Sequence, residues 1–294
     1  MEMEREEKLA HEDKQKQKHT HNEHEHLAGS GIRTAIVVGG SSGIGRETAL
    51  RLLTRGYKVY NVSRTPFKGE RVRTVTADAA QEGELEKAIT QIGIQEGAID
   101  LLVYSAGFSM AAPLEHAKSG DYRYLFEVNF FGAIEALKAA TPFLKKRGGR
   151  AILVGSLGGD MPIPFDGFYS ASKAALCMLA RESDLELRSS GVRVSALLPG
   201  GTATDFTYSR RVYGAEESKA YAPSLKKASA ALANMEQGGM NPSLVAGAII
   251  KLSAKRNPPH VAVAGGKNNM VRYLYKLMPE RVTDWFVRKK FNQK

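Results

Sequence analysis

One tyrosine–lysine pair in the sequence has a spacing that suits acid–base chemistry. Tyr169 and Lys173 lie in YSASKAALCMLARESDLEL, and of the eleven tyrosines only Tyr169 has a lysine four residues later. The apolar residues of this segment recur with a helical period, so the two side chains share one helix face, with Cβ atoms about 5 to 6 Å apart. An ammonium about 4 Å from a phenol, at an effective dielectric constant near 20, stabilises the phenolate by about 4 kcal/mol, or about three pKa units. We therefore expect Lys173 to lower the pKa of Tyr169, which would then exchange protons near neutral pH.

A glycine-rich segment near the start of the globular part predicts a phosphate-binding turn. The sequence VVGGSSGIGRETALRLL leads from a predicted strand into a predicted helix. Glycines allow a tight turn, and the free amides at the start of the helix attract an anion. A plain strand-to-helix turn is the alternative interpretation. The residues expected to line the site are Gly39, Ser41, Ser42, Gly43, Ile44 and Gly45.

The end of the second predicted strand indicates which dinucleotide would bind. NAD-preferring enzymes place an acidic side chain here, which holds the ribose hydroxyls and repels a 2′-phosphate. This chain reads NVSRT, with Ser63 at that position and Arg64 after it. A planar guanidinium can bind a phosphate through two hydrogen bonds, and Arg46 lies close enough in sequence to support it. We expect NADP(H) to be preferred over NAD(H); an ordinary surface arginine at position 64 is the alternative.

Seven short apolar segments that alternate with helical stretches predict the fold. They are rich in β-branched residues and are bounded by turn residues, as expected for strands of a parallel sheet buried on both faces. Right-handed crossovers between them predict a doubly wound α/β fold. The predicted strands are residues 34–38, 58–62, 71–76, 99–104, 150–155, 192–198 and 260–265.

Together these motifs resemble the short-chain dehydrogenase/reductase family. Ser156 follows the fifth predicted strand in AILVGSLGG, and Asn129 lies in EVNFFGA. With Tyr169 and Lys173 they match the Asn, Ser, Tyr and Lys tetrad of that family, in the family's order, and the similarity covers residues 33–204. The chain departs from the family at Val38, where a Thr is usual, and in YSAG at 104–107, where the usual sequence is NNAG.

The resemblance implies a Rossmann-type, seven-stranded sheet with strand order 3-2-1-4-5-6-7 and helices on both faces. It implies that Tyr169 is the acid or base, that Ser156 hydrogen-bonds the substrate oxygen, and that Asn129 holds a relay water. Lys173 would also hold the nicotinamide ribose. Further cofactor contacts implied by the family are Asp78 at the adenine, and Ala106, Gly107, Pro199, Gly200, Thr202 and Thr204 near the nicotinamide.

We thus expect an NADP(H)-dependent oxidoreductase that transfers hydride between nicotinamide and a carbonyl or secondary alcohol. The residues expected near the substrate are mostly apolar and favour a hydrophobic, lipid-like, sphingoid or steroid-like ketone: Met110, Met161, Ile163, Pro164, Phe165 and Phe206. Ordinary core packing explains the same residues equally well. The alternative functions are a non-catalytic NADP(H)-binding scaffold or sensor on the same fold and, among enzymes, a dehydratase or epimerase.

The remaining segments divide the chain into three parts. Residues 1–31 are poor in large apolar side chains and hold five of the seven histidines, so we expect a disordered tail, native or expression-derived, and no specific metal site. Residues 32–266 form the predicted oxidoreductase domain, and the long segment at 205–239 is expected to be a lid. Residues 267–294 predict two amphipathic helices broken at Pro279.

Charge and cysteine content limit the partners and the cellular location that we expect. From Lys255 to Lys294 there are ten basic and two acidic side chains, which fit an anionic membrane surface, an acidic partner or a solvated helix face. We expect no nucleic-acid binding, because no binding motif accompanies the charge. Cys177 is the single cysteine, and no secretory or membrane-spanning segment is evident, so a cytoplasmic location is expected. The family resemblance implies a homodimer or homotetramer.

Overall fold

The central element is a seven-stranded parallel sheet, as predicted. The computed structural model describes residues 32–69, 71–213 and 219–291, so the predicted tail at 1–31 lies outside the described residues. The strand order is β3-β2-β1-β4-β6-β7-β9, which is the predicted order 3-2-1-4-5-6-7 once two short extra strands are numbered. The strands are β1 (Thr34–Val38), β2 (Lys58–Val62), β3 (Val72–Val75), β4 (Leu101–Tyr104), β6 (Arg150–Val154), β7 (Arg193–Leu198) and β9 (Val261–Val263).

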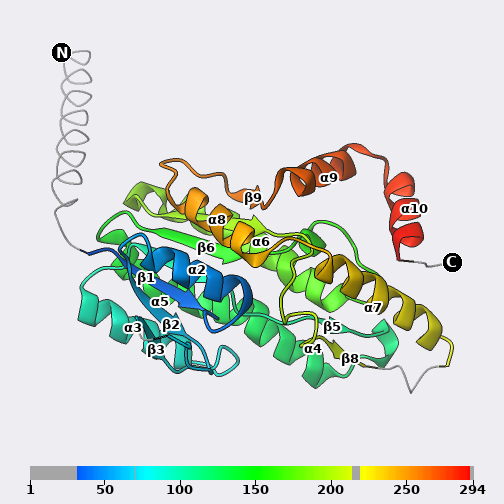
Figure 1. Ribbon diagram of the computed structural model, residues 1–294, viewed down its shortest axis with the longest axis horizontal. Coiled ribbons are helices and arrows are strands. Elements are labelled where there is room, and N and C mark those ends of the chain that lie inside the picture. The colour runs from blue at the N-terminus through cyan, green and yellow to red at the C-terminus, as the bar shows by residue number, and fades with distance from the viewer. Residues whose placement is uncertain (1–31, 70, 214–218, 292–294) are drawn as a thin grey trace, which may run out of the picture. The chain divides into compact units, whose positions relative to one another are not determined.

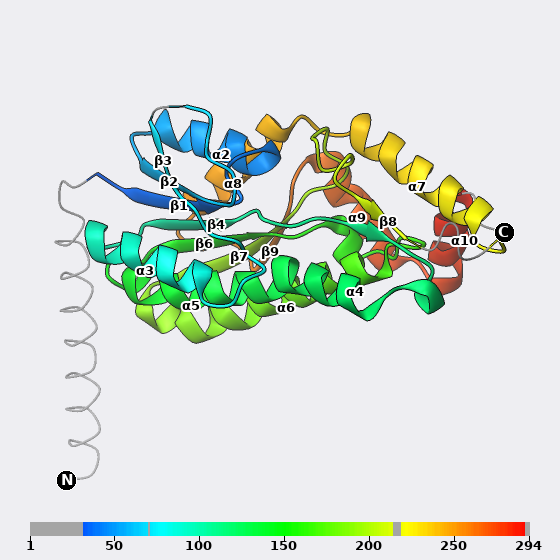
Figure 2. The same ribbon diagram turned by 90° about the horizontal axis from the view of Figure 1, so that it is seen from below.

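Helices cover both faces of this sheet (Figures 1 and 2). On one face pack α3 (Glu84–Glu96), α5 (Gly132–Lys145) and α6 (Gly167–Leu187), and on the other pack α2 (Gly43–Leu53) and α8 (Pro242–Ser253). The sequence of β1 is continuously apolar because its side chains face both cores. Ile36 and Val38 belong to the first core and Ala35 and Val37 to the second, and all four side chains are buried. The sheet therefore supplies a rigid frame between two apolar layers.

A small two-stranded sheet was not predicted. Residues Met110–Ala111 form β5, and Arg211–Val212 form β8, which pair in parallel. Two residues are too few to show a periodic pattern, so their pairing depends on contacts between segments a hundred residues apart. This small sheet holds the start of the predicted lid against the segment that follows β4.

Further helices complete the fold. Helix α7 (Ala222–Gln237) lies within the predicted lid segment, and α4 (Ser119–Phe126) precedes a π-helical turn, η2 (Glu127–Phe131). Helices α9 (Gly266–Leu277) and α10 (Glu280–Lys290) follow β9 and are separated at Pro279, as predicted. Among the described residues, no helix is both long and apolar enough to cross a bilayer.

The far end of α6 is anchored to the sheet by a buried carboxylate. Asp184 accepts hydrogen bonds from Arg193 Nε at 2.8 Å and from the backbone N–H of Val194 at 2.8 Å, both on β7. Burial alone would raise the pKa of Asp184, but hydrogen bonds from Arg193, Arg188 and Val194 outweigh it and hold the pKa at about 2. The helix that carries Tyr169 and Lys173 is thus fixed relative to the strands.

Candidate active site

The predicted site segments meet at one edge of the sheet. The glycine turn follows β1, Ser63 follows β2, Ala106 follows β4, Ser156 follows β6 and Pro199 follows β7. Because the strands are parallel, their carboxyl ends lie together, which is where ligands bind in open α/β sheets.

The structure brings the four residues of the expected tetrad together. A side-chain hydrogen bond joins Ser156 to Tyr169. A Cβ built on Gly107 would lie 3.0 Å from Asn129 Oδ1 and 3.4 Å from Lys173 Nζ, so these two side chains meet over the glycine. The absence of a side chain at position 107 therefore makes room for both polar groups.

The phenol of Tyr169 is buried and remains protonated in this arrangement. Burial raises its pKa most strongly, a hydrogen bond from Ser156 lowers it, and the negative charge of Asp166 raises it further. This differs from the expected lowering by Lys173. The reason is the direction of the lysine: its Nζ lies 5.8 Å from the centre of the Tyr169 ring and donates a hydrogen bond to the Val154 carbonyl at 2.9 Å.

Lys173 is itself a buried cation with spare donors. Its side chain is 4% exposed, and burial lowers its pKa to about 8. An ammonium has three N–H donors, of which the bond to Val154 uses one. The sheet therefore holds Lys173 in place while leaving donors for the hydroxyls of a ligand.

Asn129 is held rigidly inside a π-helical turn. Its Nδ2 donates to the Phe108 carbonyl at 3.0 Å and to Ser172 Oγ at 3.1 Å, and its Oδ1 accepts from the Phe108 N–H at 3.0 Å. Ser172 in turn donates to the Tyr169 carbonyl at 2.7 Å. The amide therefore acts as a brace between η2, the segment after β4 and α6. Single π-helical turns are frequent at functional sites.

Tyr104 is a residue whose role sequence reasoning missed. It stands where the family usually has asparagine, is fully buried, and donates a hydrogen bond to the carbonyl of Val128, next to Asn129. Burial raises its pKa strongly, so the hydroxyl stays a donor. The phenol replaces the expected amide as a support for the π-helical turn, and Gly132 provides the space, because a Cβ there would lie 2.6 Å from the Tyr104 oxygen.

The glycine turn has the shape of a phosphate cradle. Gly39 has φ +77°, and a Cβ there would lie 2.7 Å from the Ala106 nitrogen; a Cβ on Gly45 would lie 2.2 Å from the Gly39 carbonyl oxygen. Only glycine fits these positions. Ser42 caps α2 with extended backbone and makes no side-chain cap hydrogen bond. The start of α2 therefore keeps amides that suit a pyrophosphate.

The residues predicted to select the dinucleotide lie at the surface beside this cradle. The Arg64 side chain is 67% exposed, and its guanidinium lies 3.9 Å from Asp78 Oδ2 and 3.4 Å from the Tyr124 hydroxyl. Ser63 donates to the Thr65 carbonyl at 2.7 Å. Arg64 is thus held loosely and can turn toward a phosphate, and no carboxylate takes the place of Ser63.

The segment after β7 closes the other side of the cradle. A Cβ on Gly43 would lie 3.4 Å from the Thr204 side chain, so the first and last predicted cofactor segments touch. The Pro199 carbonyl accepts from the Leu157 N–H at 3.0 Å, and Thr202 Oγ1 donates to the Gly200 carbonyl at 3.0 Å. The chain therefore has residues that fit a dinucleotide from its phosphates to its nicotinamide end.

The surroundings of Tyr169 are apolar and aromatic. It packs in a cluster with Met110, and the ring of Phe206 lies 5.9 Å from its own. Ile163 lies near Ser156, since a Cβ on Gly158 would be 3.0 Å from its Cδ1 and 3.4 Å from Ser156 Oγ. Of the residues expected near the substrate, Phe206 and Ile163 are therefore near the chemistry. Met110 is fully buried in the core.

A buried charge network joins the predicted lid to the start of α6, and sequence reasoning missed it. Asp166 is 1% exposed and accepts from Ser109 Oγ at 2.7 Å, while Ser109 accepts from Arg210 Nε at 3.1 Å. Arg210 pairs with Glu236 at 2.5 Å, and Thr207 donates to the same carboxylate at 2.7 Å. No motif marks these residues, because they come together from four separate segments.

Asp166 is the residue of this network whose pKa is clearly shifted. Burial raises its pKa to about 7, although the hydrogen bond from Ser109 and the charge of Arg210 lower it. It lies three residues before Tyr169, and its charge raises the pKa of the Tyr169 phenol. The preceding residue, Phe165, has φ +65°, an uncommon conformation for a residue with a side chain.

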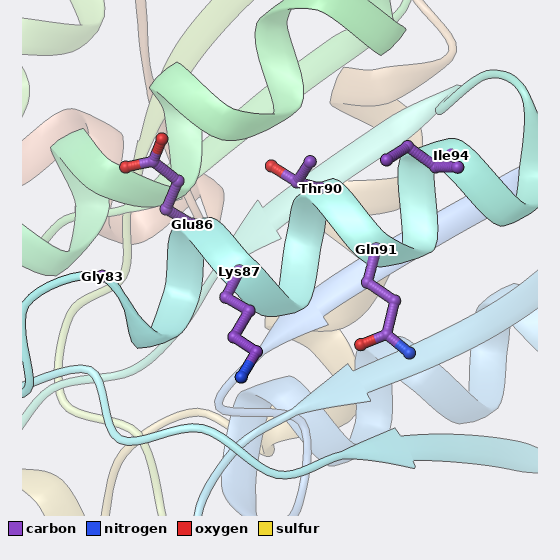
Figure 3. A pocket seen from close by; sticks show the side chains of 6 residues that line it. All are labelled: Gly83, Glu86, Lys87, Thr90, Gln91 and Ile94. Carbon is purple, nitrogen blue, oxygen red and sulfur yellow. The ribbon is translucent and has the colours of Figure 1, made fainter.

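The hollow shown in Figure 3 is a separate feature. It has a volume of about 580 Å³ and is lined by Gly83 and by five side chains of α3: Glu86, Lys87, Thr90, Gln91 and Ile94. All of these come from one helix and the residue before it, and none belongs to the tetrad or the cradle. Polar groups from several elements, which mark a binding site, converge at the carboxyl edge of the sheet and not at this hollow.

Comparisons with known proteins agree with this geometry. The family model described as short chain dehydrogenase matches residues 33–212. A 3-ketodihydrosphingosine reductase of Bacteroides thetaiotaomicron is 33% identical over 227 residues, which cover 76% of this chain and 84% of that protein. The NADPH-dependent 1-acyldihydroxyacetone phosphate reductase of Saccharomyces cerevisiae is 33% identical over 189 residues, covering 60% and 64% of the two chains. A short-chain dehydrogenase of Streptomyces avermitilis has the same fold, with a TM-score of 0.75 at 24% identity over 87% of this chain and 96% of that one.

A parallel sheet with a glycine cradle at its carboxyl edge, beside a buried tyrosine and lysine, defines a nicotinamide-dependent oxidoreductase. The family model covers more than half of the sequence, including the whole tetrad. The chain belongs to the short-chain dehydrogenase/reductase family.

Proposed function

We propose that the protein is an NADP(H)-dependent reductase of hydrophobic ketones. The observation that carries this proposal is the buried Tyr169 phenol, which is hydrogen-bonded to Ser156 and lies beside the Lys173 ammonium at the edge that holds the glycine cradle. A cofactor bound there supplies hydride to a carbonyl carbon, and the chain must deliver a proton to the carbonyl oxygen.

The residues of the chain divide this work. Ser156 donates a hydrogen bond to the substrate oxygen and orients it toward Tyr169, whose phenol then transfers its proton. The raised pKa of Tyr169 keeps this proton in place before the reaction, which suits reduction better than oxidation. Lys173 uses its remaining donors to hold ribose hydroxyls, and its charge stabilises the phenolate as it forms. Asn129 keeps η2 and α6 in register, and a relay water beside it would return the proton.

Arg64 supports NADP(H) as the preferred cofactor. Its guanidinium is exposed beside the cradle, and its side chain can reach a 2′-phosphate. The carboxylate of Asp78, 3.9 Å away, remains available to the adenine end of the nucleotide.

The apolar surroundings of the phenol support a hydrophobic substrate. Phe206 and Ile163 border Tyr169 and Ser156 respectively. The names of two relatives, 3-ketodihydrosphingosine reductase and 1-acyldihydroxyacetone phosphate reductase, describe ketones attached to lipid chains. We infer a lipid-like carbonyl compound. The described parts of the predicted lid, residues 205–213 and 219–239, would cover it in the bound state.

The proposal is tested by NADPH oxidation with a panel of hydrophobic and polar ketones. We expect turnover of the hydrophobic ketones only, and Tyr169→Phe should reduce kcat by about 10² to 10⁴, the usual contribution of a general acid. NADPH binding, followed by its fluorescence, should change little in this variant. Tyr273→Phe, at an exposed tyrosine of α9 outside the tetrad, the cradle and the lid segment, is the matched control. Unchanged turnover in Tyr169→Phe would refute the assignment, and tight NADPH binding without turnover of any ketone would indicate a binding protein instead.

We also infer a homodimer or homotetramer in the cytoplasm. The outer side of α6 exposes Met178 and Leu185, seven residues apart, and η2 exposes Phe131, so apolar side chains are available for contact between copies. Leu185→Glu should lower the mass measured by light scattering, and an unchanged mass would exclude this face.

A further inference from the structure

The C-terminal helix α9 is docked with its apolar side turned outward. Asn268, Arg272 and Tyr275 are half-buried and lie three or four residues apart, so they form the face toward the rest of the protein. The opposite face consists of exposed apolar side chains: Met270 (58% exposed), Val271, Tyr273, Leu274 and Leu277 (64%). An amphipathic helix of a globular protein normally buries such a face.

Polar contacts hold α9 in this orientation. The Arg272 guanidinium pairs with the Asp160 carboxylate, and Lys276 Nζ lies 3.6 Å from the same carboxylate. Asn268 donates to the Ala264 carbonyl at 2.9 Å. Asp160 ends the short turn that begins after Ser156, so α9 is attached to a loop of the candidate active site. The outward apolar face is therefore imposed by specific bonds.

Helix α10 repeats the arrangement. Thr283 is buried, while Val282, Trp285 and Phe286 are exposed, Trp285 by 54%. Lys289 Nζ lies 4.9 Å from the centre of the Trp285 ring, so a cation accompanies the apolar residues. Both helices lie at the same end of the protein as α7 (Figure 1).

The charge of the two helices indicates which kind of partner fits these apolar faces. Between Gly266 and Lys290 the acidic residues are Glu280 and Asp284, and the basic residues are Lys267, Arg272, Lys276, Arg281, Arg288, Lys289 and Lys290. A second copy in a two-fold contact would bring the same basic patch against itself, which is repulsive. An anionic lipid surface complements both the charge and the apolar side chains.

We propose that α9 and α10 bind the surface of an anionic lipid bilayer. The leucines, Trp285 and Phe286 enter the region between headgroups and acyl chains, and the lysines contact the phosphates. The bilayer then lies about one helix diameter, or about 10 to 12 Å, from the loop that begins at Ser156. This position would let lipid-like ketones pass from the bilayer to the site, an inference that rests on the proposed function.

Vesicle flotation with the full chain tests the proposal. We expect binding to phosphatidylcholine vesicles with about 30% phosphatidylglycerol, and at least tenfold less to pure phosphatidylcholine, because anionic lipid supplies the attraction. The double variant Leu274→Asp, Leu277→Asp should reduce binding to anionic vesicles at least tenfold. Lys289→Glu with Lys290→Glu should reduce it similarly, and raising salt from about 0.1 to about 0.5 M should weaken binding of the unaltered chain.

Leu244→Asp is the matched control, because Leu244 is an equally exposed leucine on α8. Circular dichroism confirms that each variant is folded. Absence of binding to anionic vesicles, or equal binding of the Leu274, Leu277 double variant, would overturn the proposal. A lower mass of that variant in lipid-free solution would show that a second copy covers the face instead. Flotation needs no turnover, so failure of docking is distinguishable from failure of the proposed reaction.

Discussion

Replacing the buried carboxylate of Asp166 by an amide should remove a loss of folding stability that occurs as the pH rises. Asp166→Asn keeps an oxygen that can accept the hydrogen bond from Ser109, so the network with Arg210 retains its geometry. What changes is the charge. A carboxylate whose pKa is raised by burial is stabilised in its protonated form when folded, and ionising it costs free energy.

The size and sign of the effect follow from the shift. The pKa rises from 3.8 to about 7 on folding, and one unit corresponds to 1.36 kcal/mol. The contribution of Asp166 to stability is fully present below pH about 4 and is lost as the pH rises through about 7, a change of up to about 4 kcal/mol. Asp166→Asn should therefore be more stable than the unaltered protein at pH 8 and should lose this advantage at pH 4.

Urea unfolding between pH 4 and pH 8 measures this difference. Asp205→Asn serves as the control, because it removes a carboxylate from an exposed position. The reasoning is refuted if the unfolding free energies of Asp166→Asn and the unaltered protein stay parallel across this range. A variant that is less stable at every pH would show instead that the charge of Asp166 is stabilised by Arg210.

Three further predictions concern other parts of the structure. Tyr104→Phe removes the hydrogen bond to the partly buried Val128 carbonyl and should lower the free energy of unfolding in urea by about 1 to 3 kcal/mol. An unchanged value would mean that the bond does not support η2. Arg64→Ser should raise KM for NADPH about ten- to hundredfold, since a charged hydrogen bond contributes about 1.5 to 3 kcal/mol. KM for NADH should stay nearly unchanged, and equal effects on both cofactors would exclude a phosphate contact. The pKa of Asp184 is lowered to about 2, so the roughly 2 kcal/mol that this shift contributes should be present above pH about 4 and lost as the pH falls to 2. Comparing urea unfolding of the unaltered protein and Asp184→Asn checks this, and a pH-independent difference would contradict it.

The sequence predicted the frame of the protein well because the frame depends on local patterns. Buried parallel strands such as Thr34–Val38 are continuous apolar runs, and Pro279 separates two helical periods visibly. The strand order followed from the family resemblance. The pairing of β5 with β8 could not be predicted, since two-residue strands carry no pattern and their contact joins distant segments.

The structure brings the residues of the predicted tetrad together, but their electrostatics differ from the prediction. Helical spacing placed Tyr169 and Lys173 on one side of α6, yet it could not show that Lys173 points to the Val154 carbonyl. Burial, which controls the pKa of Tyr169, is a property of the whole fold. The link between Asp166 and Arg210 was missed for the same reason, because its members are ordinary polar residues until folding brings the segment after β7 close to the start of α6.

The membrane-binding surface proposed for helix α9 lies apart from the residues that carry out the chemistry. None of its residues is buried, and the match to the family model ends at residue 212, well before it. Changes to its outer leucines leave both apolar cores untouched, so this segment can diverge among relatives without disturbing the catalytic machinery. Enzymes that share one reaction could then be directed to different cellular surfaces by variation in a single short helix.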